Sequence, residues 1–439
     1  MRNGICLIGL TVALSILSAT LFAKDAPASP PQYKILHDFT CSGTDGCEPN
    51  GGLVFDNAGN LYGTTLAGGT STSCVIGCGT VFELFPKAGG GWGVKLLHSF
   101  SDNRADGYYP AAGVILDSSG NLYGTTTAGG TATACPGGCG TVFELSPDRA
   151  GGWTEKVLYS FNPDVSTDGF DPEAGLILDA SGNLYGTTGV EAGTAFELTP
   201  SGGGTWTETN IYIFPGGVPG PGWPMKSGLI FAAAGNLYGT TFYSGRYDGC
   251  SQYNAGFGCG TVYQLTPSAA GTWTATVLYS FGGTSMDGYY PDSGVVFDAV
   301  GNLYGTTAYG GNITTCKYLQ IGGGCGTAFE LSPTAGGNWT ETILHNFGAS
   351  ATDGTLPSSG LIFGKAGNLY GTTQNTGNDS AEGYGTVFAL SPKAGGNWSE
   401  KILHNFAGGK SGAEPSGNLT IDAAGNLYGT AGVVFEVIP

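Results

Sequence analysis

The chain has 439 residues, of which 81 are glycine, 22 are tyrosine and 22 are phenylalanine. Only 11% of the residues are charged, against ~25% in an average domain, which argues against a protein built mainly of solvent-exposed helices. The formal net charge of −18 makes nucleic acid and anionic lipid surfaces poor partners on electrostatic grounds.

Residues 1–23 have the pattern of a secretory signal peptide. Arg2 precedes an apolar run from Ile5 to Leu17, and small residues lead to a cleavage point after Ala23. The run is too short to span a membrane comfortably. Because we identify neither a second apolar stretch nor a C-terminal anchor, we expect no membrane span in the mature chain and a secreted or periplasmic location. Residues 24–32 are predicted to form a linker.

The remainder of the chain repeats one motif, Gly-Asn-Leu-Tyr-Gly-Thr. Its seven copies have their asparagines at Asn60, Asn121, Asn183, Asn236, Asn302, Asn368 and Asn426. Seven copies of one unit indicate a repeat architecture. We therefore predict that residues 33–439 form a single domain, although the length alone would suggest two or three.

Each unit carries the signals of four short strands. In the second unit, Gly113–Asp117 is an apolar strand that ends in a tight turn, because the Asp117 side chain can bond the backbone two residues on. Asn121–Thr126 completes this hairpin. After a glycine-rich loop, Thr141–Leu145 forms the third strand and Lys156–Phe161 the fourth. Four antiparallel strands repeated seven times describe an all-β fold, a seven-bladed β-propeller.

The two ends of the domain each hold part of one unit. The last unit ends with its third strand, Val433–Val437, and the segment Lys34–Phe39 has the pattern of the missing fourth strand. We therefore predict that residues 33–39 complete the last blade, which closes the ring and hides its edge strands. A β-helix is the alternative fold, and the split unit argues against it.

Ten of the 11 cysteines follow the predicted signal peptide. They form five local pairs: Cys41 with Cys47, Cys74 with Cys78, Cys135 with Cys139, Cys250 with Cys259, and Cys316 with Cys325. An even number in an exported chain favours disulfides. Metal binding is the alternative, but no histidine lies near these pairs and no four-ligand cluster is evident. We expect five disulfides that hold the shape of loops.

Histidine is the first residue type to consider as a catalytic base or a metal ligand. One position of the fourth strand holds His37, His98, His345 and His404 in four units, and Tyr159, Tyr212 and Tyr279 in the others. A position that accepts either residue is interpreted as a packing position with a polar tip. No catalytic residue and no metal site are therefore predicted.

Five connections into a new unit contain an Asp-Gly pair, at Asp45, Asp106, Asp168, Asp287 and Asp353. A ring of carboxylates around the channel mouth could hold Ca²⁺. We prefer the interpretation that each aspartate caps its own turn. No cofactor is therefore expected, and Ca²⁺ is the alternative.

The fourth and fifth units break the repeat most clearly. Their loop between the second and third strands is long, shares a face with the Asp-Gly connections and is held by cysteines. The predicted ligand-binding residues are Trp223, Tyr243, Arg246, Tyr247, Asp248, Tyr253, Tyr289, Tyr290, Tyr309, Lys317 and Tyr318. Such loops are where binding sites form, and tyrosine and tryptophan faces suit sugar rings. The alternative is that these aromatic residues fold back over the base of their own loops.

Two known families resemble this unit. NHL-type propeller blades have a similar strand order, on the residues Gly-Leu-x-x-Asp-x-x-Gly-Asn-Leu-Tyr, Thr-Val-Phe-Glu-Leu-Ser-Pro and Leu-His/Tyr-x-Phe. The more specific resemblance, from Tyr33 to Pro439, is to the GloVer tandem repeat, named for Gloeobacter and Verrucomicrobia, of "choice-of-anchor" bacterial exported proteins. It implies export and repeats but no settled activity. Members differ in their C-terminal anchor, and we expect none here.

These features favour a monomeric binding module for a carbohydrate or another exported protein, acting through the loop face of the fourth and fifth blades. The alternative is an enzyme, a lyase or hydrolase that uses channel-mouth carboxylates with Ca²⁺. Because every candidate catalytic residue belongs to the repeat, we expect that the protein is not an enzyme. A purely structural surface module is the third interpretation.

Overall fold

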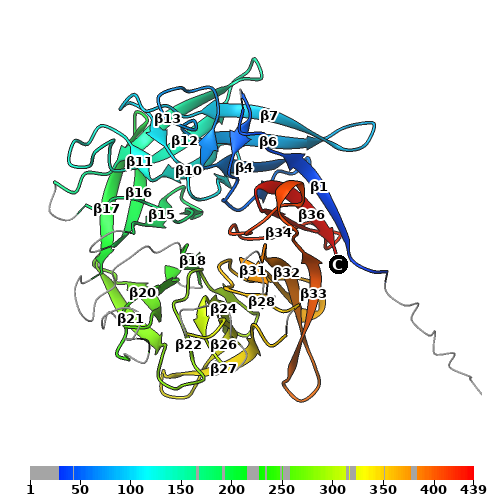
Figure 1. Ribbon diagram of the computed structural model, residues 1–439. Coiled ribbons are helices and arrows are strands. Elements are labelled where there is room, and N and C mark those ends of the chain that lie inside the picture. The colour runs from blue at the N-terminus through cyan, green and yellow to red at the C-terminus, as the bar shows by residue number, and fades with distance from the viewer. Residues whose placement is uncertain are drawn as a thin grey trace, which may run out of the picture. The chain divides into compact units, whose positions relative to one another are not determined.

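Seven four-stranded antiparallel sheets surround a common centre and form a seven-bladed β-propeller, as predicted (Figure 1). The structure, a computed structural model, describes residues 29–42, 44–164, 168–189, 193–214, 227–232, 235–247, 250, 258–312, 316, 323–350, 352–376 and 383–439. Residues 31–439 form one compact unit and residues 1–30 another. The predicted signal peptide, residues 1–23, lies outside the described residues.

The first four blades follow one another along the chain. Blade 1 contains β3 (Val54–Phe55), β4 (Leu61–Thr65), β6 (Thr80–Pro86) and β7 (Trp92–Ser99). Blade 2 contains β9 (Ile115–Leu116), β10 (Leu122–Thr126), β12 (Thr141–Pro147) and β13 (Trp153–Ser160). Blade 3 contains β14 (Ile177–Leu178), β15 (Leu184–Thr187), β16 (Thr194–Ser201) and β17 (Thr205–Ile213). Blade 4 contains β18 (Ile230–Phe231), β19 (Leu237–Thr241), β20 (Thr261–Pro267) and β21 (Trp273–Ser280).

The remaining three blades repeat this order. Blade 5 contains β23 (Val296–Phe297), β24 (Leu303–Thr307), β26 (Thr327–Pro333) and β27 (Trp339–Asn346). Blade 6 contains β29 (Ile362–Phe363), β30 (Leu369–Thr373), β32 (Thr386–Pro392) and β33 (Trp398–Asn405). Blade 7 contains β34 (Thr420–Ile421), β35 (Leu427–Thr430), β36 (Val433–Ile438) and β1 (Gln32–Asp38). Among the described residues, the 3₁₀ helix η2 (Lys365–Gly367) forms the turn between β29 and β30, and the 3₁₀ helix η3 (Gly409–Ser411) lies in the connection from blade 6 to blade 7.

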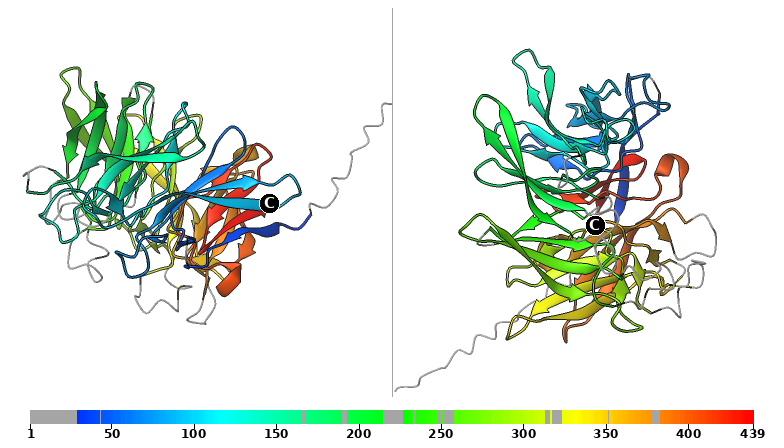
Figure 2. Two further views of the ribbon diagram at one scale, coloured as in Figure 1. Left: turned by 90° about the horizontal axis from the view of Figure 1, so that it is seen from above. Right: turned by 90° about the vertical axis from the view of Figure 1, so that its left-hand side faces the viewer.

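Strands from the two ends of the domain close the ring. β1 pairs antiparallel with β36, from Gln32 opposite Ile438 to Asp38 opposite Val433. Each view shows the first strand, in blue, beside the last strand, in red (Figures 1 and 2). The predicted closure by the N-terminal segment is therefore confirmed.

The repeated motif explains why each blade folds and why it attaches to the next. Its second glycine, Gly63 in blade 1, leaves room for the ring of Phe82, because a Cβ there would lie 2.7 Å from that ring. The following Thr64 donates a hydrogen bond of 2.7 Å to the carbonyl of Ala112 in blade 2. Equivalent threonines make the same contact at other blade interfaces. The same motif therefore provides packing within a blade and a hydrogen bond to the next blade.

The two kinds of loop predicted to share a face do so. Four two-stranded ladders join the connection entering a blade to the loop between its second and third strands. They are β2 (Gly46–Cys47) with β5 (Ala67–Gly68), β8 (Gly107–Tyr108) with β11 (Ala128–Gly129), β22 (Gly288–Tyr289) with β25 (Tyr309–Gly310), and β28 (Gly354–Thr355) with β31 (Asn375–Thr376).

The predicted disulfides all form, and they lie in these loops and connections. They join Cys41 to Cys47, Cys74 to Cys78, Cys135 to Cys139, Cys250 to Cys259, and Cys316 to Cys325. Five disulfides are typical of an extracellular or periplasmic protein. Among the described residues, no helix has the length and apolar character needed to cross a membrane.

Candidate functional site

The outermost strands of neighbouring blades face one another around the ring. We call each of these places a joint and name it by its two blades. The joint contains a histidine or tyrosine from the outer strand of the first blade, the connection that follows that strand, and the outer strand of the second blade. Three segments of the chain therefore meet at each joint whose connection the structure describes, whereas residues 215–226 of joint 3–4 lie outside the described residues.

The histidine or tyrosine of the outer strand contacts the aspartate of the Asp-Gly connection. At joint 1–2, His98 Nε2 lies 3.3 Å from Asp106 Oδ2. At joint 4–5, the Tyr279 hydroxyl donates to Asp287 Oδ2 at 3.2 Å. The same contact joins His37 to Asp45, Tyr159 to Asp168, and His345 to Asp353.

Each of these aspartates also accepts a hydrogen bond from the backbone of its own connection. Ser101 N donates to Asp106 at 3.0 Å, and Gly283 N donates to Asp287 at 2.9 Å. The prediction that the aspartates cap their own turns is therefore confirmed. The five carboxylates are distributed one to a joint, where each contacts an outer strand.

Four joints add a glutamate from the outer strand of the second blade. It comes two positions after the first tryptophan of that strand, as Glu155, Glu208, Glu341 and Glu400. Burial, followed by the charge of the neighbouring aspartate, raises the pKa to about 7 for Glu155 and Glu208, to about 8 for Glu341 and to about 9 for Glu400. The acid pairs therefore favour the binding of a proton or another cation.

The other three joints lack this glutamate. Val94 replaces it at joint 7–1, Tyr33 at joint 6–7 and Ala275 at joint 3–4. Tyr33 fills its joint, because its ring stacks on His404 with 3.6 Å between the centroids and its hydroxyl donates to the Ser411 carbonyl at 2.8 Å. Burial there lowers the pKa of His404 to about 4. The Ala275 side chain is too short to fill joint 3–4 in this way, and a cavity lies beside it.

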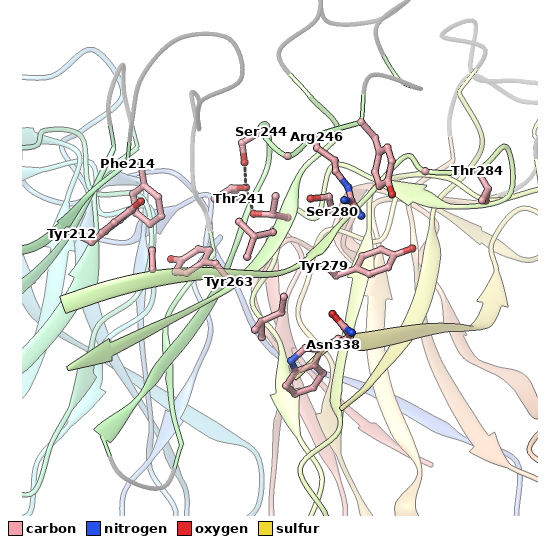
Figure 3. A pocket seen from close by; sticks show the side chains of 18 residues that line it. Tyr212, Phe214, Thr241, Ser244, Arg246, Tyr263, Tyr279, Ser280, Thr284 and Asn338 are labelled. Carbon is pink, nitrogen blue, oxygen red and sulfur yellow. Dashed lines mark hydrogen bonds between the residues drawn. The ribbon is translucent and has the colours of Figure 1, made fainter. Parts of the chain in front are cut away.

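This cavity, about 730 Å³ in volume, runs along β21, the outer strand of blade 4 (Figure 3). Blade 3 contributes Tyr212 and Phe214 to its lining, and blade 5 contributes Asn338 and Trp339. The remaining lining residues come from blade 4 and its loops: Thr241, Ser244, Gly245, Arg246, Tyr247, Thr261, Tyr263, Ala275, Val277, Leu278, Tyr279, Ser280, Gly283 and Thr284. Six of the 18 lining residues are therefore aromatic.

Polar groups lie among these rings. The Arg246 guanidinium stands over the Tyr247 ring, 4.9 Å from its centroid, and the Arg246 side chain is exposed. Ser244 and Thr241 share a hydrogen bond of 2.7 Å, drawn as a dashed line in Figure 3. The cavity thus combines apolar faces, hydroxyl groups and one positive charge.

Tyr263 is a second departure from the repeat at this cavity. The other six blades have phenylalanine at its position in the third strand: Phe82, Phe143, Phe196, Phe329, Phe388 and Phe435. The Tyr263 side chain is 2% exposed, and its hydroxyl has no hydrogen-bond partner among the described residues. Burial accordingly raises its pKa. An unpaired buried hydroxyl costs about 1–3 kcal/mol, so packing alone does not account for the tyrosine.

The structure divides the predicted ligand-binding residues into two described groups. Arg246 and Tyr247 line the cavity. Tyr243, Tyr289, Tyr290 and Tyr309 gather with Phe242 in one aromatic cluster, in which Phe242 and Tyr290 stack with 4.8 Å between centroids. Tyr289 and Tyr290 are only 9% and 5% exposed. For this cluster the geometry matches the alternative, in which the aromatic residues cover the base of their loops. Trp223, Asp248, Tyr253, Lys317 and Tyr318 lie outside the described residues.

Sequence reasoning missed several residues that line the cavity, among them Tyr212, Tyr263, Ala275 and Trp339. A signal for two of them was present. Aligning the units shows Ala275 where four units have glutamate, and Tyr263 where six have phenylalanine. Departures from the repeat within the strands therefore indicated the position of the cavity as clearly as the long loops did.

The joints also bring together groups of possible metal ligands that the sequence analysis did not predict. His98, Asp106 and Glu155 form one group, and His345, Asp353 and Glu400 form the other. Within each group, one ligand atom of each residue lies within 4.8 Å of the others. Among the described residues, these are the two places where at least three side chains of histidine, cysteine, aspartate or glutamate come this close together.

The chain belongs to the Gloeobacter/Verrucomicrobia repeat family, whose model matches residues 18–249 and 189–433. The resemblance noted in the sequence is thereby confirmed. No curated protein matches the sequence.

Several solved structures are similar in fold. A streptogramin B lyase structure is 13% identical with a TM-score of 0.51, covering 92% of this chain and 97% of that chain. A periplasmic gluconolactonase from Pseudomonas aeruginosa is 13% identical with a TM-score of 0.50, covering 84% and 88%. The extracellular domain of a protein described as a one-component system, from B. thetaiotaomicron, is 10% identical with a TM-score of 0.53, covering 92% of this chain and 39% of that chain. Likeness at such identities shows the fold alone.

Proposed function

Starting from membership of this repeat family, we propose that the protein is an exported carbohydrate-binding module whose site is the cavity along β21. One observation carries the proposal: the cavity extends along β21 from joint 3–4, where Ala275 replaces the glutamate of four other joints, to Asn338 and Trp339 of blade 5. Its volume of about 730 Å³ falls within the ~300–1,000 Å³ of small-molecule sites. A single departure from the repeat therefore coincides with space for a ligand.

The lining suits a ring that has apolar faces and hydroxyl groups at its edge. Tyr212, Tyr247 and Trp339 offer aromatic faces to the C–H groups of a sugar. Arg246, Ser244 and Asn338 offer polar atoms for its hydroxyl groups. Because aromatic residues carry much of the energy of protein interfaces, we expect the tyrosines to dominate affinity and the polar residues to set orientation.

The test fills the cavity with a side chain that the fold already tolerates elsewhere. The purified protein is screened against an array of neutral and uronic-acid oligosaccharides, and the strongest ligand is titrated by calorimetry. Ala275→Gln introduces a neutral side chain of the size that four other joints accommodate. We expect it to weaken binding at least about tenfold, or about 1.4 kcal/mol, with the thermal unfolding midpoint little changed.

The matched control is Val94→Gln, the same kind of change at joint 7–1, where Val94 is 41% exposed and does not line the cavity. This variant should bind the ligand as the wild type does. A loss of affinity in Tyr247→Ala would support aromatic contact with the sugar. The absence of any oligosaccharide ligand would overturn the proposal, as would a ligand that Ala275→Gln binds with unchanged affinity.

A further inference from the structure

The side chains at joint 5–6 have the spacing of ligands around a small metal ion. His345 Nε2 lies 3.3 Å from Asp353 Oδ2 and 3.6 Å from Glu400 Oε2. In a tetrahedral zinc site, bonds of about 2.0–2.2 Å to nitrogen and oxygen place neighbouring ligand atoms about 3.3–3.6 Å apart. Charge-assisted hydrogen bonds between nitrogen and a carboxylate are shorter, about 2.7–2.9 Å. The measured separations match edges of a coordination tetrahedron better than direct ion pairs.

Joint 1–2 repeats this arrangement with His98, Asp106 and Glu155. His98 Nε2 lies 3.3 Å from Asp106 Oδ2, and the three ligand atoms lie within 4.8 Å of one another. Asp106 is 7% exposed. Its Oδ1 atom is buried with no hydrogen-bond partner among the described residues, as is the Oε1 atom of Glu155. A buried aspartate and a half-buried glutamate beside one imidazole therefore each have one oxygen atom without a hydrogen-bond partner among the described residues.

The supporting residues hold the ligands in place. Ser101 N and Ala349 N donate hydrogen bonds to Asp106 and Asp353, at 3.0 and 2.7 Å. The rings of His98 and His345 pack edge-on against Phe100 and Phe347, with centroids 4.7 and 4.8 Å apart. Hydrogen bonds and packing around the ligand side chains fix the orientation of metal ligands.

The other joints lack part of the set. At joint 4–5, Tyr279 stands in the place of the histidine, and its hydroxyl oxygen lies 3.2 Å from Asp287 Oδ2 and 3.0 Å from Glu341 Oε2. At joint 7–1, His37 contacts Asp45 at 3.1 Å, but Val94 replaces the glutamate. The chain therefore contains its own comparison sites, in which one ligand of the three is absent.

We propose that joints 1–2 and 5–6 each bind one divalent transition-metal ion, with Zn²⁺ as the representative ion, through a histidine, an aspartate and a glutamate from two adjacent blades. A neutral imidazole with carboxylate oxygens is a ligand set that Zn²⁺ accepts, and three protein ligands leave a fourth position for water. Each ion links the outer strands of two blades. The sites are separate from the β21 cavity and do not depend on its function.

Metal binding is tested on the purified protein after dialysis against EDTA. Titration with ZnCl₂, monitored by calorimetry and by elemental analysis after gel filtration, should give two ions per chain and a higher thermal unfolding midpoint. His98→Tyr and His345→Tyr install the residue that other joints already carry, so they should fold, and each should lose one ion. The double variant should bind none.

His37→Tyr is the matched control, because that histidine lies at a joint without the glutamate. It should keep both ions. A Co²⁺-loaded sample should show the intense visible absorption of four-coordinate cobalt, which the double variant lacks. A wild-type protein that retains no Zn²⁺, or a double variant that still binds two ions, would overturn the proposal and leave a proton shared between the carboxyl groups as the explanation of the cluster.

Discussion

Two neighbouring joints share the strand β21 and differ in what fills them. At joint 4–5, Glu341 reaches from blade 5 to Tyr279 and Asp287, and the space is packed with hydrogen-bonded polar groups. At joint 3–4, Ala275 stands at the position of that glutamate, and the cavity begins beside it and continues along β21 as far as Tyr279 and Trp339. The backbone is the same repeat on both sides. The comparison teaches that one position of the unit separates a structural contact from a possible binding site.

We call joint 4–5 the filled joint and joint 3–4 the open joint. The largest effect is expected from removing the Asp287 carboxylate, which accepts hydrogen bonds at the filled joint. Asp287→Ala leaves Gly283 N–H and the Tyr279 hydroxyl without the carboxylate that they contact at 2.9 and 3.2 Å. Asp287 is 4% exposed, so we expect the free energy of unfolding to fall by about 3 kcal/mol, measured by urea denaturation. Tyr212→Phe at the open joint is the control and should change it by less than about 0.5 kcal/mol. Equal effects would show that the two joints are energetically alike.

The second test uses pH, because joint 4–5 contains a glutamate with a raised pKa, whereas joint 3–4 has Ala275 at that position. Burial and the Asp287 charge raise the pKa of Glu341 from 4.5 to about 8, so the folded protein binds this proton more tightly than the unfolded chain does. The stability that it contributes is fully present below about pH 4.5 and is lost as the pH rises through about 8. We therefore expect the wild type to be less stable at pH 9 than at pH 5.

Glu341→Gln sharpens this expectation, because glutamine keeps a hydrogen-bond donor but does not titrate. Its unfolding free energy, measured by urea denaturation across the same pH range, should depend less on pH than that of the wild type. Some dependence should remain, since Glu155, Glu208 and Glu400 also have raised pKa values. Parallel pH profiles for variant and wild type would exclude Glu341 as a source of the effect.

The smallest expected effect concerns the open joint. Tyr263→Phe removes a buried hydroxyl that has no partner among the described residues and restores the residue of the other six blades. We expect a gain of about 1 kcal/mol in the free energy of unfolding. Phe329→Tyr makes the reverse change in blade 5 and should destabilise the protein. A loss of stability in Tyr263→Phe would mean that the hydroxyl is satisfied in the folded protein.

The fold was predictable because its information is local and repeated. One short motif contains the turn, the buried leucine and the glycine that leaves room for a phenylalanine ring. Each copy of the motif therefore predicts one blade. The closing strand was predictable for the same reason, since Lys34–Phe39 repeats the pattern of the other fourth strands. The disulfides were predictable because the two cysteines of each pair lie only 4–9 residues apart in the sequence.

The joints were not predictable in the same way, because each combines a strand and the connection after it with a strand of the next blade. The partners of Asp106 are His98, before it, and Glu155, in the next blade. Tyrosine also gives no sign in the sequence of whether it faces solvent or the core. Tyr290 was predicted to bind a ligand, whereas it is 5% exposed and packs in an aromatic cluster. Burial depends on the assembled ring, which a single unit does not reveal.

The pairing of β1 with β36 has a consequence for how the chain matures. β1 is the first strand of the described residues, whereas its partner β36 (Val433–Ile438) follows the other six blades in the sequence, so the pair can form only after both segments have been made. Until then an edge strand stays open, and open edges are prone to aggregation. A product that stops short of residue 433 would retain six potential blades without this clasp. In such a product the edge of β1 would have no β36 to pair with.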